Sequence, residues 1–100
     1  MDNNEVVYRK QGFIIIRVDN GFIVINTTKE FKEGHTHIKS LEVGKTLIDC
    51  ALHNKMPKTR NLYLLQSLIR ISSNEKQIKD LESLIEVRKN KSNMSYVIKR

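Results

Sequence analysis

The sequence predicts an α+β domain in which an N-terminal antiparallel β-hairpin or three-stranded meander is followed by three α-helices packed on one face. Runs of Val, Ile and Phe typical of strands fill the chain before residue 28, and Leu and Ile recur at helical spacing after residue 40. Strands that precede helices, rather than alternating with them, indicate helices that cover one face of an antiparallel sheet. The length of 100 residues fits one domain with a modest core.

The strongest local prediction is a β-hairpin over residues 13–27. Two aliphatic runs flank Asn20-Gly21, a pair that accepts the positive φ angles of a type I′ turn. This loop would set the pairing of Val18 with Ile23, Ile16 with Ile25 and Ile14 with Thr27. Residues 5–10, which precede Gln11-Gly12, predict a third strand that would complete a meander.

The two faces of the predicted hairpin differ in composition. One is aliphatic throughout, and the other is less polar than a solvated face should be. The second face carries Phe13, Ile15, Arg17, Phe22 and Val24. We therefore expect it either to be partly covered by helix or to contact a partner, and pairing of this face between two chains would form a homodimer.

Each of the three expected helices has its own boundary signals. Ser40 can cap a helix over Leu41–His53, which Asn54 and Pro57 end. A second helix is predicted over residues 60–71, and a third begins at a capping box formed by Ser72 and Glu75. The buried stripes of the three helices are Gly44, Leu47, Ile48, Ala51 and Leu52; Leu62, Leu65, Leu68 and Ile69; and Ile78, Leu81, Leu84 and Ile85.

The domain is expected to occupy residues 1–90, with a basic C-terminal tail over residues 91–100 whose composition is typical of disorder. Residues 95–99 could alternatively form a frayed strand. The sequence contains neither an apolar run long enough to span a bilayer nor a signal-peptide pattern at its start, and its single cysteine cannot form an internal disulfide. These features predict a cytoplasmic protein with no membrane partner.

The basic residues are segregated along the chain. There are 18 Lys and Arg residues against 11 Asp and Glu residues, and two acid-free stretches, 50–74 and 87–100, contain nine of the 18. They are Lys55, Lys58, Arg60 and Arg70 in the first stretch, and Arg88, Lys89, Lys91, Lys99 and Arg100 in the second. Clustered cations create a local field that interspersed charges would cancel, so this pattern predicts a polyanionic partner.

The second helix carries the most informative polar face. If its Leu and Ile residues face inward, the side chains that project together from the other side are Tyr63, Gln66, Ser67 and Arg70, with Arg60 near the edge. These side chains suit contacts with phosphates, base edges or a protein groove. The alternative is an ordinary surface helix. Arg88, Lys89 and Lys91 would extend the same basic surface as a salt-sensitive arm, or else form a solubilising tail.

Two other groups of residues could bind a metal ion or a phosphate, and each also has a structural explanation. His35, His37, Cys50 and His53 would satisfy a tetrahedral zinc site, but their spacing matches no strong zinc signature, and Cys50 fits a small buried hydrophobic residue. Residues 34–40 could bind phosphate at a helix N-terminus, although capping alone explains Ser40. Because no nucleophile, base and orienting group form a recognisable set, we expect no enzyme activity, no metal and no cofactor.

Three segments carry a family resemblance: residues 34–39, Met56-Pro57-Lys58 and residues 65–72. They resemble small proteins carried by phages and mobile elements of low-GC Gram-positive bacteria, and the resemblance covers roughly residues 21–90. The bias toward Ile, Lys and Asn is typical of AT-rich genomes. The resemblance implies a host-defence antagonist of the anti-CRISPR type, which occupies a surface on a nucleic-acid-bound effector. The expected function is thus non-enzymatic binding of nucleic acid or of a ribonucleoprotein or protein effector, with a DNA- or RNA-binding regulator and a zinc- or small-ligand-binding module as alternatives.

Overall fold

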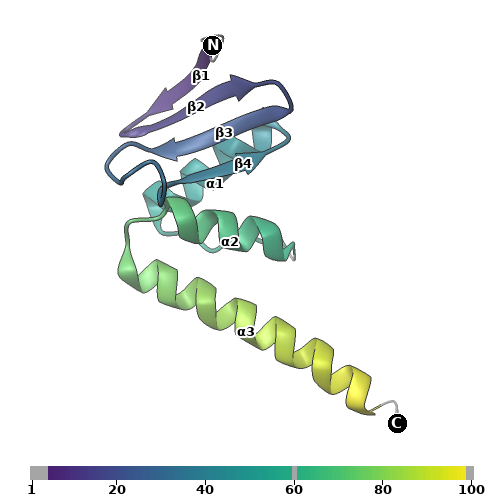
Figure 1. Cartoon of the computed structure of the whole chain (residues 1–100). Helices are drawn as coiled ribbons and strands as arrows, with labels where there is room; N and C mark the ends of the chain where they lie inside the picture. Colours follow the sequence, from purple (N-terminus) through teal and green to yellow (C-terminus); the bar gives the residue numbers. More distant parts are fainter. Residues whose placement is uncertain (1–4, 60, 99–100) are drawn as a thin grey trace.

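A computed structural model describes residues 5–59 and 61–98, with side chains as far as Lys89. Four strands precede three helices, so the α+β prediction is confirmed (Figure 1). The strands are β1 (Glu5–Lys10), β2 (Phe13–Val18), β3 (Gly21–Asn26) and β4 (His35–Ile38), and the helices are α1 (Leu41–His53), α2 (Leu62–Ile71) and α3 (Glu75–Ile98). The strands form one antiparallel sheet in the order β1-β2-β3-β4.

The helices lie on one side of the sheet, in two successive layers. Helices α1 and α2 pack against the strands, whereas α3 packs against α2 and its end projects away from the sheet (Figure 1). Gly44 of α1 lies directly over the sheet, where a Cβ atom would come within 3.3 Å of side-chain carbons of Ile15, Val24 and Ile38. The core below and around this contact consists of Phe13, Ile15, Val24, Ile38, Leu47, Ile48, Cys50, Leu65, Leu68, Ile71, Leu81 and Ile85.

The predicted hairpin is present, but its predicted register is wrong. The strands pair Val18 with Gly21, Ile16 with Ile23 and Ile14 with Ile25, so the loop is Asp19-Asn20 rather than Asn20-Gly21. The error is two residues on the partner strand. Because side chains alternate with a period of two, the shift leaves every side chain on its predicted face.

Glycine at position 21 serves strand packing rather than the turn. A Cβ atom there would overlap the carbonyl oxygen of Ile38 on β4, and the residue has a φ of +146°. Positive φ angles at both central positions, the requirement of a type I′ turn, occur instead at Gln11 (44°) and Gly12 (90°) between β1 and β2. The prediction of a type I′ turn at Asn20-Gly21 is therefore wrong, and the paired positive φ angles lie at Gln11-Gly12.

The helices cover the mixed hairpin face, which was one of its two predicted outcomes. Phe13, Ile15 and Val24 are at most 7% exposed beneath the helices. A homodimer cannot use these buried side chains, so that predicted dimer face is wrong. The aliphatic face lies on the opposite side and, among the described residues, no helix or strand covers it (Figure 1). We call it the open sheet face; it carries Ile14, Ile16, Val18, Ile23 and Ile25, with His35 and His37 beside them on β4.

Helix α1 has its predicted bounds, and the other two helices begin later than predicted. The Ser40 hydroxyl accepts the Val43 amide, as expected of a cap. Asn61 caps α2 by accepting the amides of Tyr63 and Leu64. Asn74, rather than Ser72, accepts the amide of Gln77 in the first turn of α3. The predicted capping box is therefore wrong, because Ser72 already ends α2.

Helix α3 continues to Ile98, beyond residue 90 at which we expected the domain to end. The frayed strand considered for residues 95–99 is absent over the described residues 95–98, which are helical. None of the helices in residues 5–59 and 61–98 combines the length and the apolar character needed to cross a membrane.

Candidate functional site

The two acid-free stretches meet in space. A guanidinium nitrogen of Arg88 on α3 donates a partly buried hydrogen bond of 3.0 Å to the carbonyl oxygen of Thr59 in the α1–α2 loop. Lys58 and Lys89, the neighbours of these two residues in sequence, are exposed. We call Lys55, Lys58, Arg88 and Lys89 the basic junction. Arg60 lies outside the described residues, as does the side chain of Lys91, although the Lys91 backbone belongs to α3.

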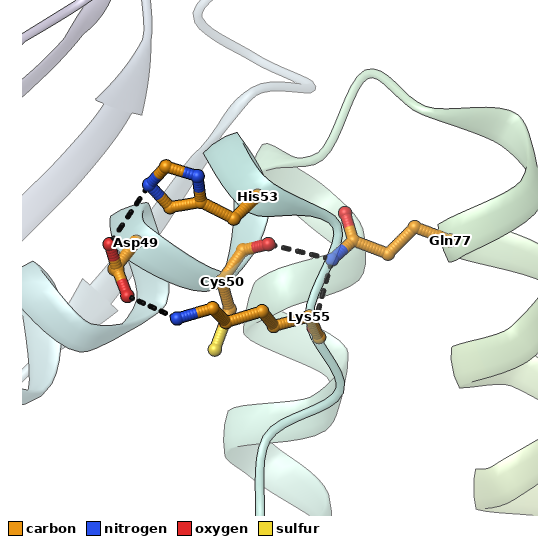
Figure 2. A network of polar contacts seen from close by, with 5 residues as sticks. All are labelled: Asp49, Cys50, His53, Lys55 and Gln77. Carbon is orange, nitrogen blue, oxygen red and sulfur yellow. Dashed lines mark hydrogen bonds and ion pairs between the residues drawn. The ribbon is translucent and has the colours of Figure 1, made fainter.

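Lys55 of the basic junction forms an ion pair with Asp49. Its ammonium lies 3.4 Å from Asp49, whose other carboxylate oxygen lies 3.3 Å from His53 (Figure 2). The Lys55 side chain is 60% exposed, and exposed pairs of this kind contribute at most about 1 kcal/mol. A polyanion could therefore recruit Lys55 at little cost.

The polar stripe of α2 lies beside the outer edge of β4. Tyr63 donates its hydroxyl hydrogen to the carbonyl oxygen of His37. Two guanidinium nitrogens of Arg70 donate to the carbonyl oxygens of His35 (2.7 Å) and Lys32 (3.0 Å). Outward carbonyls of an edge strand can template pairing with another chain, and α2 occupies two of them on β4.

Tyr63 and Arg70 thus hold α2 against β4, a structural role that the sequence did not predict. Both nevertheless remain exposed, as does Gln66 between them, and Tyr63 is 52% exposed. The Arg70 guanidinium has five N–H groups and uses two of them in these bonds, so it keeps donors for a further partner. These three residues share one exposed face of α2, as predicted. Ser67, which was predicted to project with them, is instead 1% exposed and accepts the hydroxyl hydrogen of Thr36 on β4, so that part of the prediction is wrong.

Sequence reasoning missed an aromatic cluster on the same edge. The Phe31 ring stacks on His35 with a centroid distance of 4.2 Å and an interplanar angle of 6°. The His37 ring packs edge-on against His35 at 5.3 Å. Phe31 remains 54% exposed. The available signal was an isolated aromatic within the charged run Lys29-Glu30-Phe31-Lys32-Glu33, where no core periodicity explains a Phe.

The four candidate zinc ligands are not assembled. His35 and His37 lie on β4, facing away from the helices, whereas Cys50 and His53 lie on α1. The Cys50 sulfur and the His53 ring point away from each other (Figure 2). Over residues 5–59 and 61–98, no group of three or more His, Cys, Asp or Glu residues is placed to hold a metal ion.

Cys50 has the environment of a structural cysteine. Burial raises the pKa of its thiol, the negative charge of Asp49 raises that pKa further, and Lys55 opposes both effects. The thiolate is the nucleophilic form of cysteine, so a raised pKa lowers reactivity near neutral pH. Because His53 is paired with Asp49 and points away, it does not activate the thiol.

A cavity of about 490 Å³ adjoins the basic junction. Its walls come from α1, the α1–α2 loop and Leu64 of α2, and most of them are apolar. The lining residues are Glu42, Val43, Thr46, Leu47, Cys50, Lys55, Met56, Pro57, Lys58, Thr59 and Leu64. The size lies within the range that small-molecule sites occupy, about 300–1,000 Å³.

Comparisons of the chain with protein-family models, with curated proteins and with solved structures each found no match.

Proposed function

We propose that this protein is a non-enzymatic, basic binding protein that engages nucleic acid, either free or held by a protein effector. The resemblance seen in the sequence favours a phage-encoded inhibitor of host defence, of the anti-CRISPR type, as its biological role. In that role the protein would occupy the nucleic-acid-binding surface of an effector complex. A regulator that binds DNA or RNA directly is the alternative within the same chemistry.

The observation that supports this proposal most strongly is the contact between Arg88 and Thr59. It joins a basic loop to a basic segment of helix that are distant in sequence. Helix α3 is divided by charge: its acidic residues lie between Glu75 and Glu86, and its remaining residues include no acid. Cations concentrated in this way attract phosphates and release counterions on binding.

The test compares two variants of equal net charge. In the first, the basic-stretch residues Lys58, Lys89 and Lys91 are replaced by Ser. In the second, the exposed residues Arg9, Lys76 and Lys79, all outside those stretches, are replaced by Ser. Fluorescence anisotropy with labelled oligonucleotides should show at least tenfold weaker binding for the first variant and less than threefold for the second, because each lost phosphate contact removes a counterion-release contribution. Equal affinities in the two variants would refute the placement of the site.

The two biological roles differ in the partner that binds tightly. An inhibitor should bind free nucleic acid only at the non-specific level, with a Kd of roughly 10⁻⁴ to 10⁻⁶ M, and should bind a nucleic-acid–effector complex far more tightly. A regulator should bind one free sequence much more tightly than others. Competition between specific and random oligonucleotides separates these outcomes.

The cavity beside the basic junction favours a second candidate, a module that binds a small ligand with an apolar body. Cys50 lines this cavity, so an occupant should slow alkylation of the thiol. Native mass spectrometry of the purified protein should then reveal an additional ligand mass. A bare protein mass, together with a Cys50 alkylation rate that candidate ligands do not change, would count against this module.

A further inference from the structure

Two segments that are far apart in sequence meet along the outer edge of β4, where the His rings of the first lie toward the open sheet face and the side chains of the second belong to α2. Phe31, His35 and His37 come from the β3–β4 loop and β4, and Tyr63, Gln66 and Arg70 come from α2. The bonds from Tyr63 to His37 and from Arg70 to His35 and Lys32 hold the two segments together. We call these six residues the β4–α2 ledge.

The ledge exposes aromatic rings that the core does not need. Phe31 and Tyr63 are 54% and 52% exposed, and neither belongs to the buried cluster under the sheet. One face of the Phe31 ring packs on His35, which leaves the other face available to a flat partner. Rings fixed by their neighbours lose little conformational entropy on binding, so the ledge is preorganised for stacking.

Hydrogen-bond donors and cations accompany the rings. The two bonds to backbone carbonyls fix the guanidinium of Arg70 while leaving some of its N–H groups unused. Lys32 and Lys39, at either side of β4, are exposed, as are Glu30 and Glu33 in the preceding turn. Because these carboxylates offset the lysines, stacking would supply more of the affinity here than net charge.

We propose that the β4–α2 ledge binds unpaired nucleotides of single-stranded RNA or DNA. This inference rests on the proposed function and specifies the form of nucleic acid. Bases in a duplex present only their edges, whereas unpaired bases can stack on Phe, Tyr and His rings with Arg or Gln beside them. The basic junction would then contact other phosphates of the same strand.

The test measures anisotropy of labelled oligo-U and oligo-dT of about 12 nucleotides, and of a duplex of the same length, at about 50 mM salt. Wild-type protein should bind the single strands at least fivefold more tightly than the duplex. Phe31→Ser should weaken single-strand binding by roughly fivefold or more and leave duplex binding unchanged, since one stacked base is lost. Tyr63→Ala should act in the same direction.

Two controls separate stacking from folding. Tyr63→Phe removes the hydroxyl bond to β4 but keeps the ring, so it should bind single strands within twofold of wild type. Val6→Thr alters another exposed apolar residue, on the opposite edge of the sheet, and should also have no effect. Circular dichroism should give all variants the wild-type spectrum.

Each contrary result has a distinct meaning. Equal affinity for single strand and duplex, with no effect of Phe31→Ser, would overturn the ledge while the proposed function stands. Binding confined to a protein effector, with free strands ignored, would also overturn it. Sensitivity to Phe31→Ser without sensitivity to the junction substitutions would support the ledge and overturn the placement of the basic site. Failure to bind any polynucleotide, free or held by an effector, would overturn both.

Discussion

Three segments meet at the side chain of Gln77, which is 2% exposed (Figure 2). Its amide nitrogen donates to the carbonyl oxygens of Cys50 (2.9 Å) and Lys55 (3.1 Å), and its amide oxygen accepts the hydroxyl of Ser72 (2.7 Å). One residue thereby joins the end of α1 to the start of α3. The position of the basic junction depends on this joint, because Lys55 lies within it.

Replacing Gln77 with Leu should lower the free energy of unfolding by about 1–3 kcal/mol, because the buried Ser72 hydroxyl and the Lys55 carbonyl would lose a partner. Urea denaturation followed by circular dichroism measures the change. Lys79→Ala, at an exposed position on the same helix, should change the same free energy by less than about 0.5 kcal/mol. Equal effects of the two substitutions would contradict the role of Gln77.

Cys50 gives stability a dependence on alkaline pH. Its pKa is raised in the folded protein, so above the usual thiol pKa, about 8.5, the unfolded chain loses a proton that the folded chain retains. The free energy of unfolding should therefore fall as pH rises through that range. Cys50→Ala should show a shallower fall when urea titrations are compared at successive pH values, and parallel curves would rule out the contribution.

At the scale of single residues, the sequence predicts the roles that depend on neighbours in the chain, but not the roles that depend on distant partners. Ser40 was identified as a cap because its own neighbours define that role. The roles of Gln77, Tyr63 and Arg70 depend on backbone partners 22 to 38 residues away, and no local pattern encodes those contacts. For the same reason, the sequence does not show that the segment containing Phe31 and His35 lies beside α2.

At the scale of elements, the packing of α1 on the sheet depends on Gly44. A Cβ atom there would lie 2.6 Å from the Ile38 Cδ1 atom and 2.9 Å from the Ile15 Cδ1 atom. Gly in a helix interior lowers helix stability by roughly 1 kcal/mol relative to Ala, so its presence in α1 reflects this close approach to the sheet.

Gly44→Val should therefore destabilise the fold by about 1–3 kcal/mol, since the added methyl groups overpack the contact between helix and sheet. Thr46→Val, at an exposed position of the same helix, should stay within about 0.5 kcal/mol of wild type. Thermal and urea unfolding of both variants provide the measurement. A Gly44→Val protein as stable as wild type would show that α1 sits farther from the sheet.

Elements with strong periodicity could be predicted, and short ones could not. The strand Glu5–Lys10 and the helix Leu41–His53 have their predicted bounds because alternating or helical spacing marks them along their length. Strand β4 has four residues, two of them histidines, and its sequence predicts a loop leading into α1 instead. The hairpin register failed because two Gly-containing pairs competed for one turn type, and tertiary contact with β4 decided the role of Gly21.

At the scale of the whole molecule, the protein is elongated, and its longest axis extends 54 Å. The sheet lies at one end, and the acid-free end of α3 projects at the other (Figure 1). The segregation of charge was visible in the sequence, whereas the meeting of its two stretches through Arg88 and Thr59 was not. This arrangement presents a basic arm and an aromatic ledge from one scaffold.

The most direct test of the central claim is the salt dependence of nucleic-acid binding by the wild-type protein. If the four cations of the basic junction each neutralise one phosphate, a plot of log affinity for a single strand against log salt should have a slope of about −3 between about 50 and 200 mM salt. The variant lacking Lys58, Lys89 and Lys91 should give a slope closer to zero. An affinity that does not change with salt, or an equal slope in the variant, would contradict the account.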